Sequence, residues 1–360
     1  MEKDRHFMQR TLELARRGQG RVHPNPLVGA VLVKEDRIVG EGFHEKYGEA
    51  HAEVNALRNA ADSPDGATLY VNLEPCTYKG NTPPCVPQIL DAGIKRVVIG
   101  LQDPNPKVNG QGIQQLEAAG LEVVVGVLEA ECFELNRGFI HQMNTGMPWV
   151  TLKLAVTIDG FIADHQRKSQ WITGPKSREQ VHQWRAEHNA ILVGGGTIKA
   201  DNPSLTVRTT SGVNPTRVII DPEQLAPQQA KVFTDRHAET IVITTNTAGN
   251  GRSGNSFDFE QLILREDDAD FIAWENILTT LYRERNILSV FVEGGAEISS
   301  SLLQSGLVNE LIIMTGPKII GQGLSPFHQV ELPLERAIPW KVFDVMHFGD
   351  DVCIRYRSNK

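Results

Sequence analysis

A histidine, a glutamate and two cysteines are spaced in a way that suits hydrolysis at a metal ion. His51 and Glu53 are one residue apart, and Cys76 and Cys85 follow along the chain. Zinc held by one imidazole and two thiolates keeps a coordination position open, and it lowers the pKa of a water bound there to about 7. Such a site supplies the hydroxide needed to remove an aromatic amine. We expect Glu53, beside the metal but not bound to it, to move protons between the water, the ring nitrogen and the departing amine.

The spacing also determines where these side chains lie on their helices. Residues two apart on a regular helix point in nearly opposite directions, so we expect His51 at the very start of its helix, with the metal at that end. Cys85 likewise precedes a helix, where the positive end of the helix dipole favours a thiolate. Two helix starts facing one cation are electrostatically unfavourable by themselves, and we expect the two thiolates to outweigh them.

A structural zinc site is the main alternative. Such sites usually have four protein ligands in paired spacings, and no fourth ligand is evident nearby in the sequence. A structural zinc also has no need of a free carboxylate such as Glu53. The other two cysteines, Cys132 and Cys353, are isolated and are interpreted as buried core residues.

The metal pattern resembles the cytidine-deaminase superfamily, with eight residues between Cys76 and Cys85 in place of the usual two. Three segments look like the diaminohydroxyphosphoribosylaminopyrimidine deaminase of riboflavin synthesis, namely HPNPLVGAVLV, GEGFHEKYGEAHAEVNAL and NLEPCTYKGNTPPC. The resemblance covers almost all of residues 3–145. It implies a zinc-dependent deaminase with a cytidine-deaminase-like α/β/α fold.

The same resemblance implies roles for three further residues. Asn25 would contact the base or the ribose, and His44 and Lys79 would help to recognise the ribosyl phosphate. Taken alone, Lys79 is typical of a solvated loop lysine and His44 of a surface histidine. The loop DPNPKVNGQG (103–112) also matches the family, with no physical role evident beyond turn formation.

Two glycine-rich segments of the second half follow predicted strands. The GGGT segment (194–197) and Glu293-Gly294-Gly295 are places where backbone can approach a phosphate and a helix can begin. Each is a weak signal alone, because glycines often only close turns. The fingerprint G-x-G-x-x-G with a following acidic residue is absent, which disfavours a Rossmann domain.

Four segments of this half look like the reductase domain fused to this deaminase, namely LKLAVTIDGFIA, SQWITG, HQWRAEHNAILVGGGTIKADNPSLTVR and VFVEGGAEISSSLL. The match covers residues 147–345 and implies a dihydrofolate-reductase-like α/β fold that uses NADPH. The residues implied to line the substrate pocket are Ser169, Arg185, Leu205, Arg208 and Glu293. The residues implied to hold NADPH are Ala155, Trp171, Thr197, Asp201 and the 295–301 turn, which begins at Gly295.

Several of these residues have ordinary structural interpretations. Arg185 alone is typical of a surface salt bridge, Trp171 of a core residue and Asp201 of a turn start. Lys153 is either a proton donor or a structural lysine. Gln322 stands where the family often has consecutive glycines, which concerns the local loop and not the activity.

Composition excludes other classes of protein. The net charge of −8 argues against a broad nucleic-acid surface. No stretch approaches the ~20 apolar residues of a transmembrane helix, and the N-terminal residues lack the apolar core of a signal peptide. We therefore expect a cytoplasmic protein that binds a phosphorylated pyrimidine, no nucleic acid and no membrane, and forms a homo-oligomer, as is common in this fold.

Short strands and helices alternate along both halves, which predicts an α/β fold with helices on both faces of a sheet. In the first half we expect helices at 4–17 (with Asp4 as N-cap), 50–61, 85–93 and before Gly120, and strands at 28–33, 37–42, 67–74, 95–100 and 121–126. In the second half we expect strands at 149–160, 189–197, 216–221, 239–245 and 288–295, and helices at 175–188 and 274–286. Residues 249–270 are predicted to form an exposed connection.

The turn-rich segment 143–148 divides the chain into a deaminase domain (1–146) and a reductase domain (147–360). The resulting hypothesis is a bifunctional enzyme that deaminates the pyrimidine and then reduces its ribosyl side chain with NADPH. A nucleoside or base deaminase with an accessory domain is one alternative, and a non-catalytic zinc-containing ligand-binding protein is another.

Overall fold

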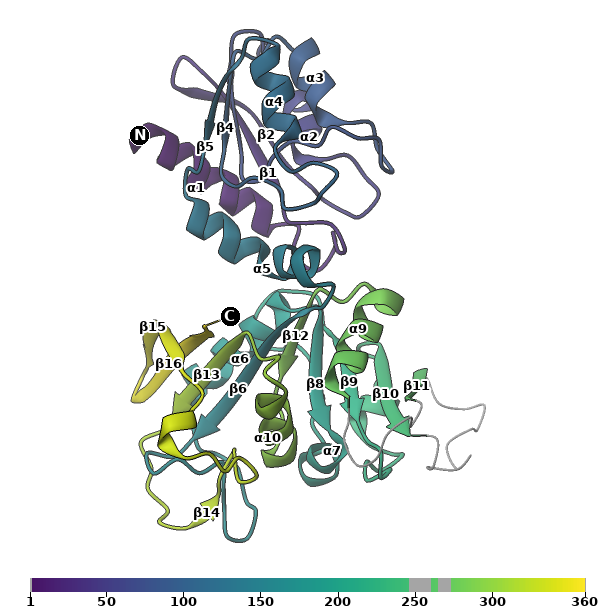
Figure 1. Ribbon diagram of the computed structural model, residues 1–360, viewed down its shortest axis with the longest axis vertical. Helices are drawn as coiled ribbons and strands as arrows, with labels where there is room; N and C mark the ends of the chain where they lie inside the picture. The colour runs from purple at the N-terminus through teal and green to yellow at the C-terminus, as the bar shows by residue number, and fades with distance from the viewer. Residues whose placement is uncertain (1, 246–259, 265–272, 360) are drawn as a thin grey trace. The chain divides into compact units, whose positions relative to one another are not determined.

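The chain divides into two units, Met1–Gly146 and Met147–Lys360, in the computed structural model (Figure 1). The structure describes residues 2–245, 260–264 and 273–359. Each unit is built on one large sheet with helices on both faces, so the predicted α/β class is confirmed. Among the described helices, none is both long enough and apolar enough to cross a membrane.

The first unit has a five-stranded sheet in the order β2-β1-β3-β4-β5. The strand β1 pairs antiparallel with β2 and with β3, and β4 pairs parallel with β3 and with β5. The strands are β1 (Gly29–Lys34), β2 (Arg37–Phe43), β3 (Thr68–Val71), β4 (Arg96–Ile99) and β5 (Glu122–Val125). The helices are α1 (Glu2–Arg16), α2 (Ala52–Arg58), α3 (Cys85–Asp91), α4 (Gln111–Ala118) and α5 (Glu129–Thr145).

Alternate residues of these strands pack on opposite faces, because side chains on a strand have a period of two. Leu32 and Leu69 belong to the core under α2, α3 and α4. Val31 and Val98 belong to the core under α1 and α5. Figure 1 shows these two groups of helices on either side of the sheet.

The second unit has a nine-stranded sheet in the order β11-β10-β9-β8-β12-β6-β13-β16-β15, and β14 pairs with β7 separately. All neighbours from β11 to β13 pair parallel, and the last two pairs are antiparallel. The strands are β6 (Trp149–Val156), β7 (Ala163–Asp164), β8 (Ala190–Gly194), β9 (Thr216–Ile220), β10 (Thr240–Thr245), β11 (Glu260–Leu264), β12 (Ser289–Val292), β13 (Glu310–Thr315), β14 (Gly323–Leu324), β15 (Trp340–Phe348) and β16 (Asp351–Ser358). The helices are α6 (Pro175–Glu187), α7 (Gly195–Asp201), α8 (Lys231–Thr234), α9 (Trp274–Arg285) and α10 (Ala296–Ser305), and a 3-10 turn spans Leu334–Arg336.

The central strands of this sheet are buried on both faces. Leu152 and Val290 pack with α9 and α10 on one side. On the other side Phe291 packs with α6, and Ile191 packs with α7 and α8. Parallel strands covered by helices on both faces are expected to be apolar throughout, as these are.

The structure differs from the sequence predictions in three respects. The helix α1 begins at Glu2, so Asp4 is not its N-cap; its carboxylate instead binds Arg96 and Tyr70. Most of the predicted connection 249–270 lies outside the described residues, but its segment Glu260–Leu264 forms β11 on β10. Several elements have no counterpart among the predicted ones, namely α5, α7, α8, α10, β7, β13, β14 and the hairpin of β15 and β16, and the predicted strand 189–197 already ends at Gly194.

Candidate active sites

The three predicted zinc ligands lie together at the starts of two helices. His51 is the N-cap residue of α2, with extended backbone, and Cys85 is the first residue of α3. The expected place of His51 at its helix start is therefore confirmed. Cys76 follows the end of β3, and its carbonyl oxygen accepts hydrogen bonds from the amides of Cys85 and Val86. The ligand atoms all lie within 4.8 Å of one another.

These atoms fit a tetrahedral zinc ion. Nδ1 of His51 lies 3.5 Å from Sγ of Cys76 and 3.3 Å from Sγ of Cys85. Ordinary zinc–nitrogen and zinc–sulfur bond lengths place two tetrahedral ligands about 3.6 Å apart. Nε2 of His51 lies 3.3 Å from Oγ1 of Thr82, which is a partner for its proton. Among the described residues this group has three members and no fourth histidine, cysteine or acidic side chain, so three ligands and an open position fit a catalytic zinc better than a structural one.

The electrostatics of this cluster favour one thiolate and a buried acid. Hydrogen bonds from the Cys85 thiol and from His51 lower the pKa of Cys76, and the same contact with Cys76 raises the pKa of Cys85. Glu53 is 3% exposed, and its carboxyl hydrogen-bonds with Cys85. Burial raises the pKa of Glu53, although His51 opposes this. A carboxyl of raised pKa beside the metal ligands suits the proton transfers predicted for it.

Asn25 and His44 form a chain of hydrogen bonds beside the cluster. Nδ1 of His44 donates to the carbonyl oxygen of Ala50 at 3.1 Å, since a carbonyl can only accept. Its Nε2 accepts from Nδ2 of Asn25 at 3.0 Å. The His44 ring centroid lies 5.5 Å from that of His51. His44 is thus buried with both ring nitrogens bonded within the protein, and Asn25 keeps its Oδ1 for another partner.

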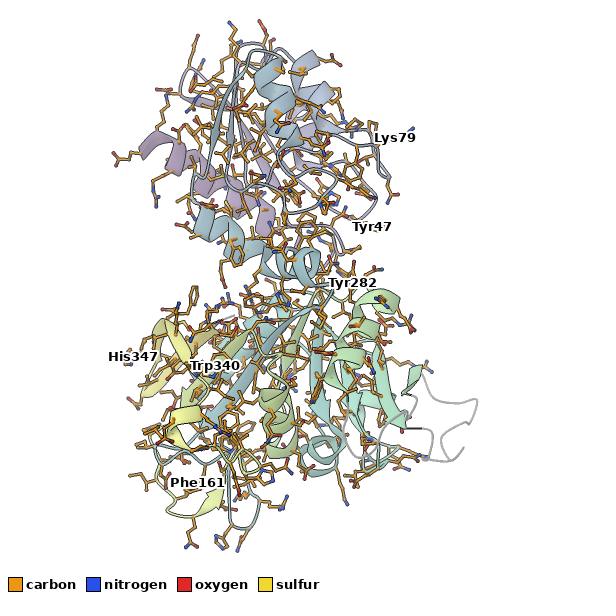
Figure 2. All side chains as sticks on the ribbon, viewed as in Figure 1. Tyr47, Lys79, Phe161, Tyr282, Trp340 and His347 are labelled. Carbon is orange, nitrogen blue, oxygen red and sulfur yellow. The ribbon has the colours of Figure 1, made fainter. Side chains whose placement is uncertain are left out.

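Lys79 lies on the exposed loop between the two cysteines. Figure 2 shows its side chain at the margin of the first unit, pointing outward. Its neighbour Tyr78 is 39% exposed and lies under Nζ of Lys107, which is 5.7 Å from the ring centroid. The loop therefore brings a cation near the metal site without burying it.

Two asparagines that the sequence analysis missed hold the segment that follows Asn25. Asn136 Oδ1 accepts from the amide of Leu27 at 2.8 Å, and its Nδ2 donates to the Leu27 carbonyl at 2.9 Å. Asn72 donates to the same carbonyl and accepts from the amide of Gly29. Both side chains are buried. No spacing in the sequence signals these contacts, because they join residues far apart in the chain.

In the second unit the carboxyl ends of β6, β8 and β12 meet, since these strands are parallel and their order is β8-β12-β6. Ala155 lies near the end of β6, Thr197 in the first turn of α7, and Gly295 at the N-cap of α10. A Cβ on Gly295 would lie 3.7 Å from Thr197 Oγ1. These predicted cofactor residues are therefore at one edge of the sheet.

This edge fits the phosphates of NADPH. No side chain caps the N-terminus of α10, so its first-turn amides remain available to an anion. The backbone is also closely packed: a Cβ on Gly195 would lie 2.0 Å from Asp221 Oδ1, and one on Gly294 would lie 2.7 Å from Ile298 Cγ2. A side chain larger than glycine at either position would displace Asp221 or Ile298, or the backbone itself.

Arg185 and Glu293 form a two-point ion pair, with Nε–Oε1 at 2.6 Å and Nη2–Oε2 at 3.0 Å. A third donor of Arg185 binds the Thr206 carbonyl. The pKa of Glu293 is lowered overall, because the charges of Arg185 and Lys153 outweigh the effect of burial, which raises it. Burial lowers the pKa of Lys153, opposed by Glu293. The structure thus brings together Arg185, Glu293 and Lys153, the lysine for which the sequence leaves two roles open.

The other predicted reductase residues lie on loops around these strand ends. Leu205 is buried, and Arg208 is exposed. Ser169 is half-buried and precedes Trp171, which is 60% exposed with the Arg178 guanidinium 4.4 Å from its ring centroid. Asp201 ends α7 and accepts from Gln170 Nε2 at 3.3 Å.

Comparison with known proteins assigns both units. The family model for the cytidine and deoxycytidylate deaminase zinc-binding region matches residues 1–101, and that for the RibD C-terminal domain matches residues 148–354. The riboflavin biosynthesis protein RibD of Aquifex aeolicus is 42% identical over 357 residues, which is 99% of either chain. That of Bacillus amyloliquefaciens is 45% identical over 324 residues, 90% of this chain and 87% of the relative.

The chain belongs to the RibD family. A solved structure from Thermotoga maritima, a diaminohydroxyphosphoribosylaminopyrimidine deaminase/5-amino-6-(5-phosphoribosylamino)uracil reductase, is 40% identical with a TM-score of 0.87 and covers 99% of both chains. Acinetobacter baumannii RibD is 37% identical with a TM-score of 0.86, covering 100% of this chain and 99% of that one. As a RibD protein, this chain is a bifunctional enzyme of riboflavin biosynthesis that combines a zinc-dependent deaminase with an NADPH-dependent reductase.

Proposed function

We propose that the two units, assigned as residues 1–146 and 147–360, act in turn on one phosphorylated pyrimidine. The first removes an amine from diaminohydroxyphosphoribosylaminopyrimidine, and the second reduces the ribosyl side chain of the product to ribityl phosphate. The Thermotoga maritima relative carries both activities in its name and matches nearly the whole chain. The observation that carries the proposal is the buried Glu53 carboxyl beside the three-donor cluster His51, Cys76 and Cys85.

In the deaminase, His51, Cys76 and Cys85 would hold the zinc, which supplies an activated water for attack on the amine-bearing ring carbon. Glu53 accepts a proton from the water at its carboxylate and delivers it to the ring nitrogen. It then takes the second proton from the new hydroxyl on the ring carbon and delivers it to the amine, which leaves as ammonia while the carbonyl forms. Because Glu53 is buried, its proton is kept from bulk water between these transfers.

Substrate binding in the deaminase falls to Asn25 and Lys79. The hydrogen bond from Asn25 to His44 leaves Asn25 Oδ1 to accept from a donor on the base or ribose. Lys79 supplies an exposed cation for the ribosyl phosphate. Since both ring nitrogens of His44 are engaged, we assign His44 to holding Asn25 and only indirectly to the phosphate.

In the reductase, Ala155, Trp171, Thr197, Asp201 and Gly295 would hold NADPH, which supplies the hydride for the anomeric carbon in its opened imine form. Arg208 has an exposed guanidinium that suits the substrate phosphate, and we assign Ser169 and Leu205 to the same substrate pocket. Arg185 is engaged by Glu293, so it orients that carboxylate within the pocket. Glu293 and Lys153, both partly buried, are the groups that we assign to exchange a proton with the sugar.

Two further properties remain predictions: a homo-oligomeric state and a cytoplasmic location. Sedimentation of the purified chain tests the first, and fractionation of cells that produce it tests the second. Neither is needed for the assignment of the two reactions.

The experiment supplies the zinc-loaded protein with the diaminopyrimidine ribosyl phosphate and NADPH, and follows ammonia release and NADPH oxidation together. Wild type should release ammonia first and then oxidise NADPH. Glu53→Gln should do neither, yet oxidise NADPH when given the deaminated pyrimidine. Glu122→Gln, a surface substitution of the same kind, serves as the control. NADPH oxidation by Glu53→Gln with the diamino substrate would contradict the proposed order, and inactive zinc-loaded wild type would contradict the function.

A further inference from the structure

A buried carboxylate two residues before Cys76 has no part in the chemistry described above. Glu74 is 4% exposed, and its own amide donates to Leu101 at 2.9 Å. Four backbone amides donate to its two oxygens: Gly112 at 2.8 Å and Ile113 at 3.2 Å to Oε1, and Gly110 at 2.9 Å and Asp103 at 3.2 Å to Oε2. A buried carboxylate is costly unless it is paired or hydrogen-bonded, and here each oxygen has two amide donors.

These contacts close the loop 103–113, which includes the turn-forming segment for which the sequence suggests no role. Oε2 binds the amide at its start, Asp103, and the amide at its end, Gly110. Oε1 binds two amides in the first turn of α4, where no side chain of the helix caps them. One side chain therefore fixes both ends of the loop and the helix that follows.

The loop also packs directly on the backbone that leads to the metal. A Cβ on Gly112 would lie 2.3 Å from the Pro75 carbonyl oxygen, so only glycine allows this approach. Pro75 is the residue between Glu74 and Cys76. The start of α4 thus rests against the peptide that precedes a zinc ligand.

From this loop one side chain reaches the segment that carries Lys79. Nζ of Lys107 lies over the ring of Tyr78, 5.7 Å from its centroid. Lys107 is itself held by the loop, because its amide donates to Asn105 Oδ1 at 3.1 Å, and the Asn105 amide donates to Asp103 Oδ1 at 2.8 Å. A continuous series of contacts therefore runs from Glu74 through the loop to Tyr78, next to Lys79.

We propose that Glu74 is a positioning residue for deamination: it holds loop 103–113 as a fixed wall against Tyr78, and so fixes the substrate-binding segment 77–84. The proposal rests on the deaminase function proposed above. In Glu74→Gln one side of the side-chain amide is an NH₂ group that faces two backbone N–H donors, whichever way the amide turns. The loop then loses one of its fixed ends, while the three zinc ligands keep their own contacts.

The test measures steady-state ammonia release, zinc content and reduction of the deaminated pyrimidine for the full chain in four forms: wild type, Glu74→Gln, Lys107→Met and the double variant. Glu74→Gln should raise the deaminase KM about tenfold to a hundredfold with a smaller change in kcat, since a misplaced wall weakens substrate positioning. Zinc should stay at one per chain, and the reductase should be unchanged. Lys107→Met, which removes only the cation over the Tyr78 ring, should raise KM less and add nothing to Glu74→Gln.

Glu122→Gln, on the exposed face of β5, is the matched control and should behave as wild type. An unchanged KM in Glu74→Gln would overturn the proposal, and so would additive effects of the two substitutions. Loss of zinc or of the folded unit in Glu74→Gln, with a normal KM in Lys107→Met, would also overturn it, because Glu74 would then be structural only. Failure of wild type to release ammonia is a different result, which contradicts the proposed function.

Discussion

The two active sites of this chain are built on different physical plans. In the deaminase, three side chains converge on a point, and a fourth, Glu53, is buried beside them. In the reductase, the residues proposed to hold a long cofactor lie along the ends of β6, β8 and β12, and a partly buried ion pair follows the end of β12. A point-like site depends on every ligand, whereas an extended surface spreads its binding energy over many contacts. Substitutions should therefore have larger effects in the first site than in the second.

Replacement of a zinc ligand should give the largest effect. Cys85→Ser removes one of the two sulfur ligands, at the start of α3, and deamination should fall at least about a thousandfold as zinc is lost. Reduction of the deaminated pyrimidine should continue at the wild-type rate, which a parallel NADPH assay measures. A matched loss of both activities would contradict the independence of the two sites.

Replacement of the partly buried reductase carboxylate should have the next largest effect. Glu293→Gln removes a charge that Arg185 and Lys153 both face, and NADPH oxidation with the deaminated pyrimidine should slow by about 10²–10⁴-fold in kcat. Ammonia release from the diamino substrate is the internal control and should not change. A normal kcat would mean that Glu293 only holds Arg185 in place.

Removal of the exposed arginine should have a moderate effect. Arg208→Ala should raise the reductase KM about tenfold with little change in kcat, because a guanidinium that binds the phosphate at the surface contributes to substrate binding alone. Arg178→Ala, which removes the cation over Trp171 and leaves Arg208 in place, is the comparison variant: its effect should fall on the KM for NADPH. An equal effect of both variants on the pyrimidine KM would remove the distinction between the two binding regions.

The smallest effect concerns stability and not chemistry. Hydrogen bonds from Arg96, and then from Tyr70, lower the pKa of Asp4 below its ordinary value of 3.8, so the carboxylate stabilises the folded first unit. Asp4→Asn should cost this unit about 1–3 kcal/mol near neutral pH. Because the folded pKa is the lower one, the difference from wild type should be complete above pH 3.8 and disappear as the pH falls below it. Denaturant unfolding at several pH values measures this, and a difference that persists in acid would contradict the ionic origin.

The sequence predicts the point-like site better than the extended one for a physical reason. A zinc ligand set requires particular residue types at short spacings, and the start of α2 at His51 follows from helix geometry alone. The pairing of Arg185 with Glu293 depends instead on β8 and β12 being neighbours, which no local pattern shows. For the same reason the supports Asn136 and Glu74 could not be predicted, since their partners lie many residues away.

Some elements of the fold were also beyond sequence reasoning. The helix α5 has a non-helical residue, Asn136, in its interior and only a weak apolar face, so its pattern is faint. The strand β15 has mostly exposed residues, and its pairing with β16 at the sheet edge determines its form. Both elements depend on tertiary contacts with residues distant in the sequence, which a local pattern does not show.

The most direct test of two independent sites is a zinc titration of the metal-free protein. Ammonia release from the diamino substrate and NADPH oxidation with the deaminated pyrimidine are measured at each addition. We expect ammonia release to rise from zero and level off at one zinc per chain, while NADPH oxidation stays constant throughout. A reductase that needs the metal, or a deaminase that is active without it, would contradict the account.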